Sequence, residues 1–152
     1  MAITCGTPIV NPSCTEVEVI TVGLIGPQGP QGIPGPAGGA AISIVAGEDL
    51  GGHRAVVTDN GLAYYADNTN TDHSNIVLGI TLGAVNAGDP ASVVTLGELP
   101  GLFGLTPNAP IYLSNNGILT QVVPTTGFIQ QLGTAIVSDR MLVNIQPIIQ
   151  QV

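Results

Sequence analysis

The residues of this sequence that could carry acid–base chemistry are a few carboxylates and two histidines, all in segments rich in turn-forming residues. General acid–base catalysis needs titratable groups whose surroundings separate their pKa values, and an apolar pocket usually does this. No such pocket is indicated around the carboxylates, which are Glu48, Asp49, Asp59, Asp67 and Asp72. His53 and His73 are the only histidines, and no Ser or Cys stands in a recognisable nucleophile motif. We interpret these carboxylates as turn formers and solubilising charges, and we expect neither enzymatic activity nor a cofactor.

Metal binding is also not expected. Residues 67–73 are rich in oxygen donors, but they lack the ligand order, the central Gly and the terminal Glu of an EF-hand. Cys5 and Cys14 have no further Cys or His ligands nearby that would complete a zinc site. Their close spacing fits a local disulfide, an interchain pair or two free thiols, and the sequence leaves these alternatives open.

The charge balance excludes several classes of partner. Lys is absent, and Arg54 and Arg140 are the only cations against ten carboxylates, so the net charge is −8. Binding to a phosphate backbone needs several Lys or Arg contacts, and an acidic surface repels both DNA and anionic lipid. No apolar run reaches the roughly 18 residues that span a bilayer, and the first residues lack the basic region of a secretory signal. We expect no nucleic-acid partner and no membrane insertion.

The most specific motif is a run with Gly at every third position. It spans residues 23–38, and its Pro-containing triplets place Gly26, Gly29, Gly32, Gly35 and Gly38 in one register. Three polyproline-II chains wound together leave room on their shared axis only for Gly, while Pro presets φ. A flexible Pro/Gly linker is the alternative, but such a linker has no physical reason to keep an unbroken period. Residues 23–39 are therefore predicted to form a collagen-like stalk whose axis these glycines line.

This stalk is too short to hold three chains together by itself. At about 3.1 Å per residue its Pro-containing triplets, Gly26 to Ala37, make a rod on the order of 35 Å long. A neighbouring domain must trimerise first and raise the local concentration of the three strands. We therefore expect a homotrimer in which residues 40–152 form the trimerising domain.

Residues 1–22 differ from the rest of the chain. The segment Glu16, Val17, Glu18, Val19, Ile20, Thr21, Val22 continues an alternation of polar and apolar residues that is typical of a strand, and no hairpin partner follows it. An unpaired strand can add to the edge of another protein's sheet. We interpret residues 1–22 as an anchor that binds another protein; the alternatives are a disordered tail and a small strand knot at the base of the trimer.

Residues 40–152 are predicted to be mainly β. Short Val, Ile and Leu runs are separated by Gly, Asn, Asp and Pro, and two Asn-Gly pairs, Asn60-Gly61 and Asn116-Gly117, lie between apolar runs as in hairpin turns. Each hairpin is followed by a loop, a strand and a closing strand, so the two halves resemble a repeat. We expect a small β-barrel or sandwich of about eight strands. Tyr64 and Tyr65 should point to opposite faces of one strand, which argues against a flat aromatic platform for sugars.

The order of anchor, collagen triplets and compact β domain resembles bacteriophage fibre and head-decoration proteins. The similarity extends over roughly residues 41–149, and the segments that carry it are 52–57, 77–81, 110–113 and 127–135. The resemblance implies a trimer projecting from a virion, made and assembled in the host cytoplasm. The chain departs from tail receptor binders in being short, poor in aromatic residues and free of a long shaft. These departures favour a capsid head fibre anchored to a capsid or other virion protein; the alternative is a tail-associated fibre or adhesin tip that binds a host cell surface.

Overall fold

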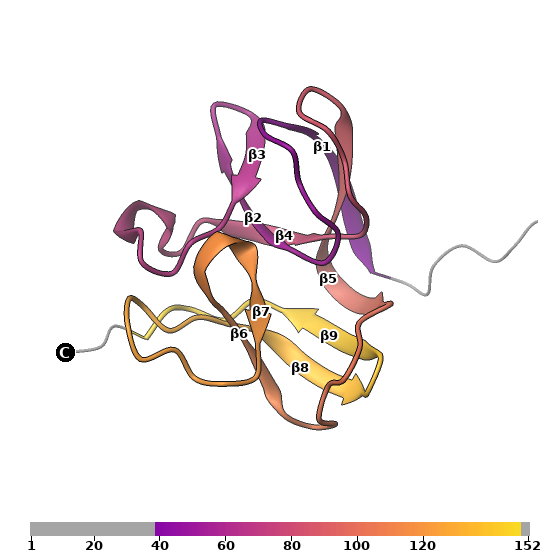
Figure 1. Cartoon of the computed structure of the whole chain (residues 1–152), viewed down its shortest axis with the longest axis vertical. Coiled ribbons are helices and arrows are strands. Elements are labelled where there is room, and N and C mark those ends of the chain that lie inside the picture. Colours follow the sequence, from indigo (N-terminus) through magenta and orange to yellow (C-terminus); the bar gives the residue numbers. More distant parts are fainter. Residues whose placement is uncertain (1–38, 150–152) are drawn as a thin grey trace, which may run out of the picture. The chain divides into compact units, whose positions relative to one another are not determined.

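Residues 39–149, which the computed structural model describes, form a mainly β domain (Figure 1). Runs rich in β-branched and aliphatic residues, interrupted by Gly, Asn and Pro, favour strands here. The strands are β1 (Ala40–Ala46), β2 (Ala55–Asp59), β3 (Leu62–Tyr65), β4 (Val77–Thr81), β5 (Pro90–Pro100), β6 (Pro110–Leu113), β7 (Leu119–Thr120), β8 (Gln131–Val137) and β9 (Arg140–Asn144). Two short 3-10 helices, η1 (Thr71–His73) and η2 (Asn115–Gly117), lie in connections. No helix within residues 39–149 has the length and apolar character that a membrane crossing requires.

The first five strands close into a small barrel. β1 pairs in parallel with β3 through Val45 and Ala46, and it pairs antiparallel with β5 along most of its length. These two pairings complete the ring β1-β3-β2-β4-β5. Ring closure leaves fewer unpaired strand edges than an open sheet would. Of the two architectures that the sequence left open, the structure has the barrel.

β5 is shared by two halves of the domain. Its first part pairs with β1 and β4, whereas Leu96 to Pro100 pair with β9, from which the sheet continues as β9-β8-β6-β7. In Figure 1 the ring of β1 to β5 lies above, and β6 to β9 lie below. We refer to residues 39–95 as the barrel half and to residues 96–149 as the C-terminal half.

The two halves repeat one pattern of strand pairing. Val56 lies opposite Gly79 in the β2–β4 pair, and Ile111 lies opposite Gly133 in the β6–β8 pair. Each pair has a register shift directly after this position. The β2–β3 pair corresponds to the β6–β7 pair in the same register. The β4–β5 pair likewise corresponds to the β8–β9 pair. The repeat expected from the sequence is therefore present in the strand registers.

The chain enters β2 and β6, the equivalent strands of the two halves, in the same conformation. His53 and Asn108 have positive φ angles of 57° and 61°. The backbone N–H of His53 donates to the carbonyl of Thr81, and that of Asn108 donates to the carbonyl of Ala135, each at 2.8 Å. The same bend therefore precedes β2 and β6.

Gly79 and Gly133 occupy equivalent positions at which the adjoining strand leaves no room for a side chain. A Cβ on Gly79 would lie 2.9 Å from the carbonyl carbon of Val94, and a Cβ on Gly133 would lie 3.0 Å from that of Leu142. Each would also meet the carbonyl oxygen of the same partner residue. Both halves therefore need Gly where β4 approaches β5 and where β8 approaches β9.

Two apolar clusters form the core. One lies inside the barrel half and includes Val56, Ala63 and Val93. The other joins outward-facing residues of the barrel half to residues of the C-terminal half. Its members include Val57, Ile80, Val94, Ile111, Leu132 and Met141. The C-terminal half therefore covers one outer face of the barrel.

Candidate interaction surfaces

The carboxylates that could have carried chemistry hold loops in place. Glu48 accepts a hydrogen bond from the backbone N–H of Tyr65 at 2.8 Å. Asp49 accepts one from the backbone N–H of Ala87 at 2.9 Å. Both carboxylates thus bind loops to distant strands or turns, in keeping with their interpretation as turn formers.

Asp67 organises the oxygen-rich loop. Its Oδ1 accepts hydrogen bonds from the backbone N–H and the hydroxyl of Thr69, at 2.8 and 2.6 Å, and its own N–H donates to Nδ1 of His73 at 3.0 Å. Burial alone would raise the pKa of the Asp67 carboxyl, but the hydrogen bonds from Thr69, together with weaker contributions that include the backbone of Asn116, hold the pKa below its ordinary value. Among the described residues, no group of three or more His, Cys, Asp or Glu is placed to hold a metal ion.

The two Asn-Gly pairs have the same backbone form but different surroundings. Asn60 and Gly61 have φ angles of 49° and 81° and make the exposed turn between β2 and β3, as the primed hairpin turns require. Asn116 and Gly117, in η2, have φ angles of 50° and 68°. Gly117 is buried, and its N–H donates to the carbonyl of Ala66 at 2.6 Å, so this turn connects the two halves.

The remaining predicted site residues lie outside the described part of the chain. These are the axis glycines Gly26, Gly29, Gly32, Gly35 and Gly38, and the anchor residues 16–22. Cys5 and Cys14 lie outside it as well. Their predicted roles stay predictions.

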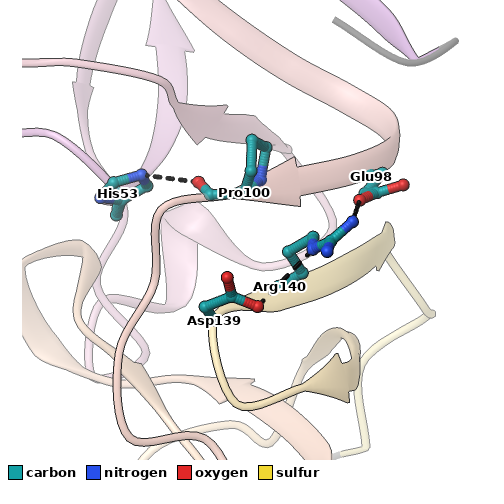
Figure 2. A network of polar contacts seen from close by, with 5 residues as sticks. All are labelled: His53, Glu98, Pro100, Asp139 and Arg140. Atoms are coloured by element: carbon teal, nitrogen blue, oxygen red, sulfur yellow. Dashed lines mark hydrogen bonds and ion pairs between the residues drawn. The ribbon is translucent and has the colours of Figure 1, made fainter.

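A charged cluster marks the end of β5 and the turn before β9 (Figure 2). The Nη1 of Arg140 donates to Oε1 of Glu98 at 2.9 Å, and its Nε lies 3.5 Å from Oδ1 of Asp139. The hydrogen bond and charge of Glu98, with those of Asp139, raise the pKa of Arg140. Nearby, Nε2 of His53 lies 3.1 Å from the carbonyl oxygen of Pro100. One guanidinium therefore partly neutralises two carboxylates, and the three groups together keep one negative charge.

A shallow depression of about 380 Å³ lies beside the β7–β8 loop. Seven of its ten lining residues carry a hydroxyl or amide group; the lining consists of Asn68, Thr69, Ser114, Asn115, Thr120, Val122, Val123, Pro124, Thr125 and Thr126. None of these residues is charged or aromatic. The depression could hydrogen-bond a neutral polar group, but it lacks the stacking platform that sugar sites commonly use.

The outer face of the C-terminal half is open within residues 39–149. The strand registers make Leu142 equivalent to Val94 of the barrel half. Val94 is 3% exposed, whereas Leu142 is 45% exposed, and Leu96 on the neighbouring strand is 55% exposed. These two leucines belong to the closing strands expected from the sequence, which assigned them no functional role. The available signal was that Leu142 stands between Met141 and Val143, which alternation places inside.

No family model matches the chain, and no match was found among curated proteins.

Proposed function

We propose that this chain is a structural virion protein, a homotrimeric fibre that decorates the exterior of a bacteriophage capsid. Residues 1–22 would anchor the fibre to a capsid or other virion protein, residues 23–39 would form the stalk, and the β domain would be the outer cap. The observation that carries the proposal is Gly at every third position from Gly26 to Gly38. A triple helix of three chains is the physical reason for such a period.

The β domain supports this function by its size and its chemistry. It follows the stalk directly and has its own core, so it can provide the module that brings three chains together. The carboxylates and histidines described above make structural hydrogen bonds, and we propose no catalytic role for them. An acidic surface with a net charge of −8 per chain suits a soluble decoration.

The alternative is a tail-associated fibre or adhesin tip that binds a host receptor. The depression near Thr125 and Thr126 is the feature that favours it, because its hydroxyl and amide groups could contact a neutral receptor group. Copy number separates the two hypotheses. Head fibres should recur across the shell in virion images, whereas tail fibres should be few and confined to the tail.

Deleting residues 1–22 should abolish attachment to the particle and leave the trimer intact. The predicted strand lies in the deleted segment, whereas the stalk and the β domain remain. The measurement is co-sedimentation of purified trimers with particles that lack the fibre, together with light scattering of the free protein. We expect bound protein to fall to background.

A pair of single substitutions sharpens this experiment. Val19→Asp places a charge on an apolar position of the predicted strand and should weaken attachment, whereas Glu18→Gln should leave it near the wild-type level. If the trimer that lacks residues 1–22 still bound the particles at the wild-type level, the proposed orientation of the fibre would be wrong. The β domain would then be the attachment element. Failure of the wild-type protein to bind would contradict the capsid-decoration function itself.

A further inference from the structure

The chain reaches the β domain directly beside Leu96. A Cβ on Gly39 would lie 2.6 Å from the carbonyl oxygen of Leu96, and Ala40 pairs with Leu96 in the β1–β5 ladder. Gly38, the last glycine of the stalk register, is two residues from Ala40. Successive Cα atoms are 3.8 Å apart, so Ala40 lies within about 8 Å of the Gly38 Cα. In a trimeric stalk Gly38 lies at the shared axis, and the surface around Leu96 must therefore lie near that axis.

From Leu96 an open face extends across the C-terminal half. Glu98 pairs with Leu142, Leu142 with Thr134, and Thr134 with Pro110, so these four residues form a row across β5, β9, β8 and β6. Residues paired in this way point to the same side of a sheet. Leu96 is a diagonal neighbour of Leu142, because it pairs with Asn144 two residues further along β9. The two exposed leucines thus belong to one surface.

The repeat shows that this surface differs from its counterpart. In the barrel half, the equivalent face carries Ile80 and Val94, and it is buried against the C-terminal half. In the C-terminal half, Thr134 and Leu142 occupy those positions and remain partly or well exposed. Two adjacent exposed leucines next to the stalk, on a face whose counterpart is buried, favour a contact with another surface.

Charge also favours this face for contact between copies. Each chain has a net charge of −8, so three copies repel one another wherever unpaired carboxylates meet. Arg140 is one of only two cations in the chain, and it pairs with Glu98 on this face. Asp139, 3.5 Å from the same guanidinium, leaves one unbalanced carboxylate beside the row, and the other residues of the row are uncharged. Repulsion between acidic copies is therefore reduced here.

We propose that three copies of the chain meet through this outer face, with Leu96 and Leu142 at the centre of the contact. The proposal rests on the trimeric fibre proposed above, and it adds the residues that hold the trimer. In the trimer each leucine would be shielded by a neighbouring copy. The short stalk would then align because the β domains have already associated.

Leu142→Asp in the full chain should dissociate the trimer. A desolvated carboxylate at the centre of an interface typically weakens association by roughly 30-fold or more. The matched control is Ile76→Asp, because Ile76 has the same exposed fraction of 45% but lies between η1 and β4, outside the row of residues paired with Leu142. Sedimentation over a dilution series at 37 °C should show monomers for Leu142→Asp and trimers for Ile76→Asp. Far-ultraviolet circular dichroism should show the same strand content in both.

A labelling experiment decides the question even if Leu142→Asp fails to fold. In a Cys5→Ser, Cys14→Ser background, Leu142→Cys and Ile76→Cys are exposed to a maleimide, and their modification rates are compared. The cysteine at position 142 should react at least tenfold more slowly than the one at position 76. Equal rates, or an undisturbed trimer in folded Leu142→Asp, would overturn this interface while leaving the trimeric fibre in place. A monomeric wild-type chain would instead contradict the trimeric fibre itself.

Discussion

Replacing Gly133 by alanine should lower the free energy of unfolding of the β domain by about 3 kcal/mol, the upper end of the usual cost of overpacking. The added Cβ would lie 2.8 Å from Met141 Cε and 3.0 Å from the carbonyl carbon of Leu142, and it would also meet the Leu142 carbonyl oxygen. A flexible Met side chain can move away, but the backbone of β9 is held by its pairing with β5 and β8. The measurement is equilibrium denaturation at a fixed protein concentration.

Gly83→Ala is the matched control, because a Cβ at Gly83 would have no other heavy atom within 4 Å. It should leave the free energy of unfolding within about 0.5 kcal/mol of the wild-type value, as surface substitutions usually do. Gly79→Ala should resemble Gly133→Ala, since Gly79 faces the backbone of Val94 in the same way. If Gly133→Ala were as stable as Gly83→Ala, the result would contradict the inference that β8 approaches β9 too closely for a side chain at position 133.

Replacing Gly29 by valine should disrupt the stalk while the β domain stays folded and trimeric. In the proposed triple helix Gly29 lies at the axis, where a branched side chain has no room. The β domain has its own core and, by the proposal above, its own contacts between copies. Limited proteolysis should cleave the variant within residues 23–39, and light scattering should still report a trimer.

Gln28→Val tests whether the effect depends on the Gly register. Position 28 precedes Gly29 and points away from the axis in a collagen triplet, so the same valine should be tolerated there. Wild-type resistance to protease in Gly29→Val would indicate that the segment is a loose linker. Equal sensitivity of both variants to protease would show that valine disrupts the stalk for a reason other than the lack of room at the axis.

The mainly β fold and its internal repeat could be predicted because they depend on local patterns. Asn60-Gly61 and Asn116-Gly117 mark the turns, and the apolar runs around Val77 to Thr81 and Met141 to Val143 mark strands. The prediction that Tyr64 and Tyr65 face opposite sides is also confirmed, because they pack against different core clusters. Turn-forming pairs and short apolar runs are sufficient for the turns and the strands, and period-two geometry is sufficient for the two tyrosines.

Barrel closure could not be predicted, because it depends on contacts between distant segments. β1 closes the ring through a parallel pairing with β3 and an antiparallel pairing with β5. Nothing in the sequence of residues 40–46 indicates which strands β1 will pair with. Alternation indicates that Leu142 points to the outer face of the sheet, but not that this face stays uncovered, since Val94 at the equivalent position is just as apolar and is buried. Whether such a residue is covered depends on which surface packs against it.

The pairing of β1 with β5 has a consequence for the order of assembly. The ribosome makes residues 23–39 before β1, yet β1 has no place until residues 90–96 are available, and the open face is complete only after β9. In the proposed trimer the stalk is therefore synthesised first and aligned last. Winding would start at Gly38, beside the associated domains, and proceed towards Gly26. Nascent chains would thus be protected from locking their triplets out of register, because so few triplets cannot stay together before the domains meet.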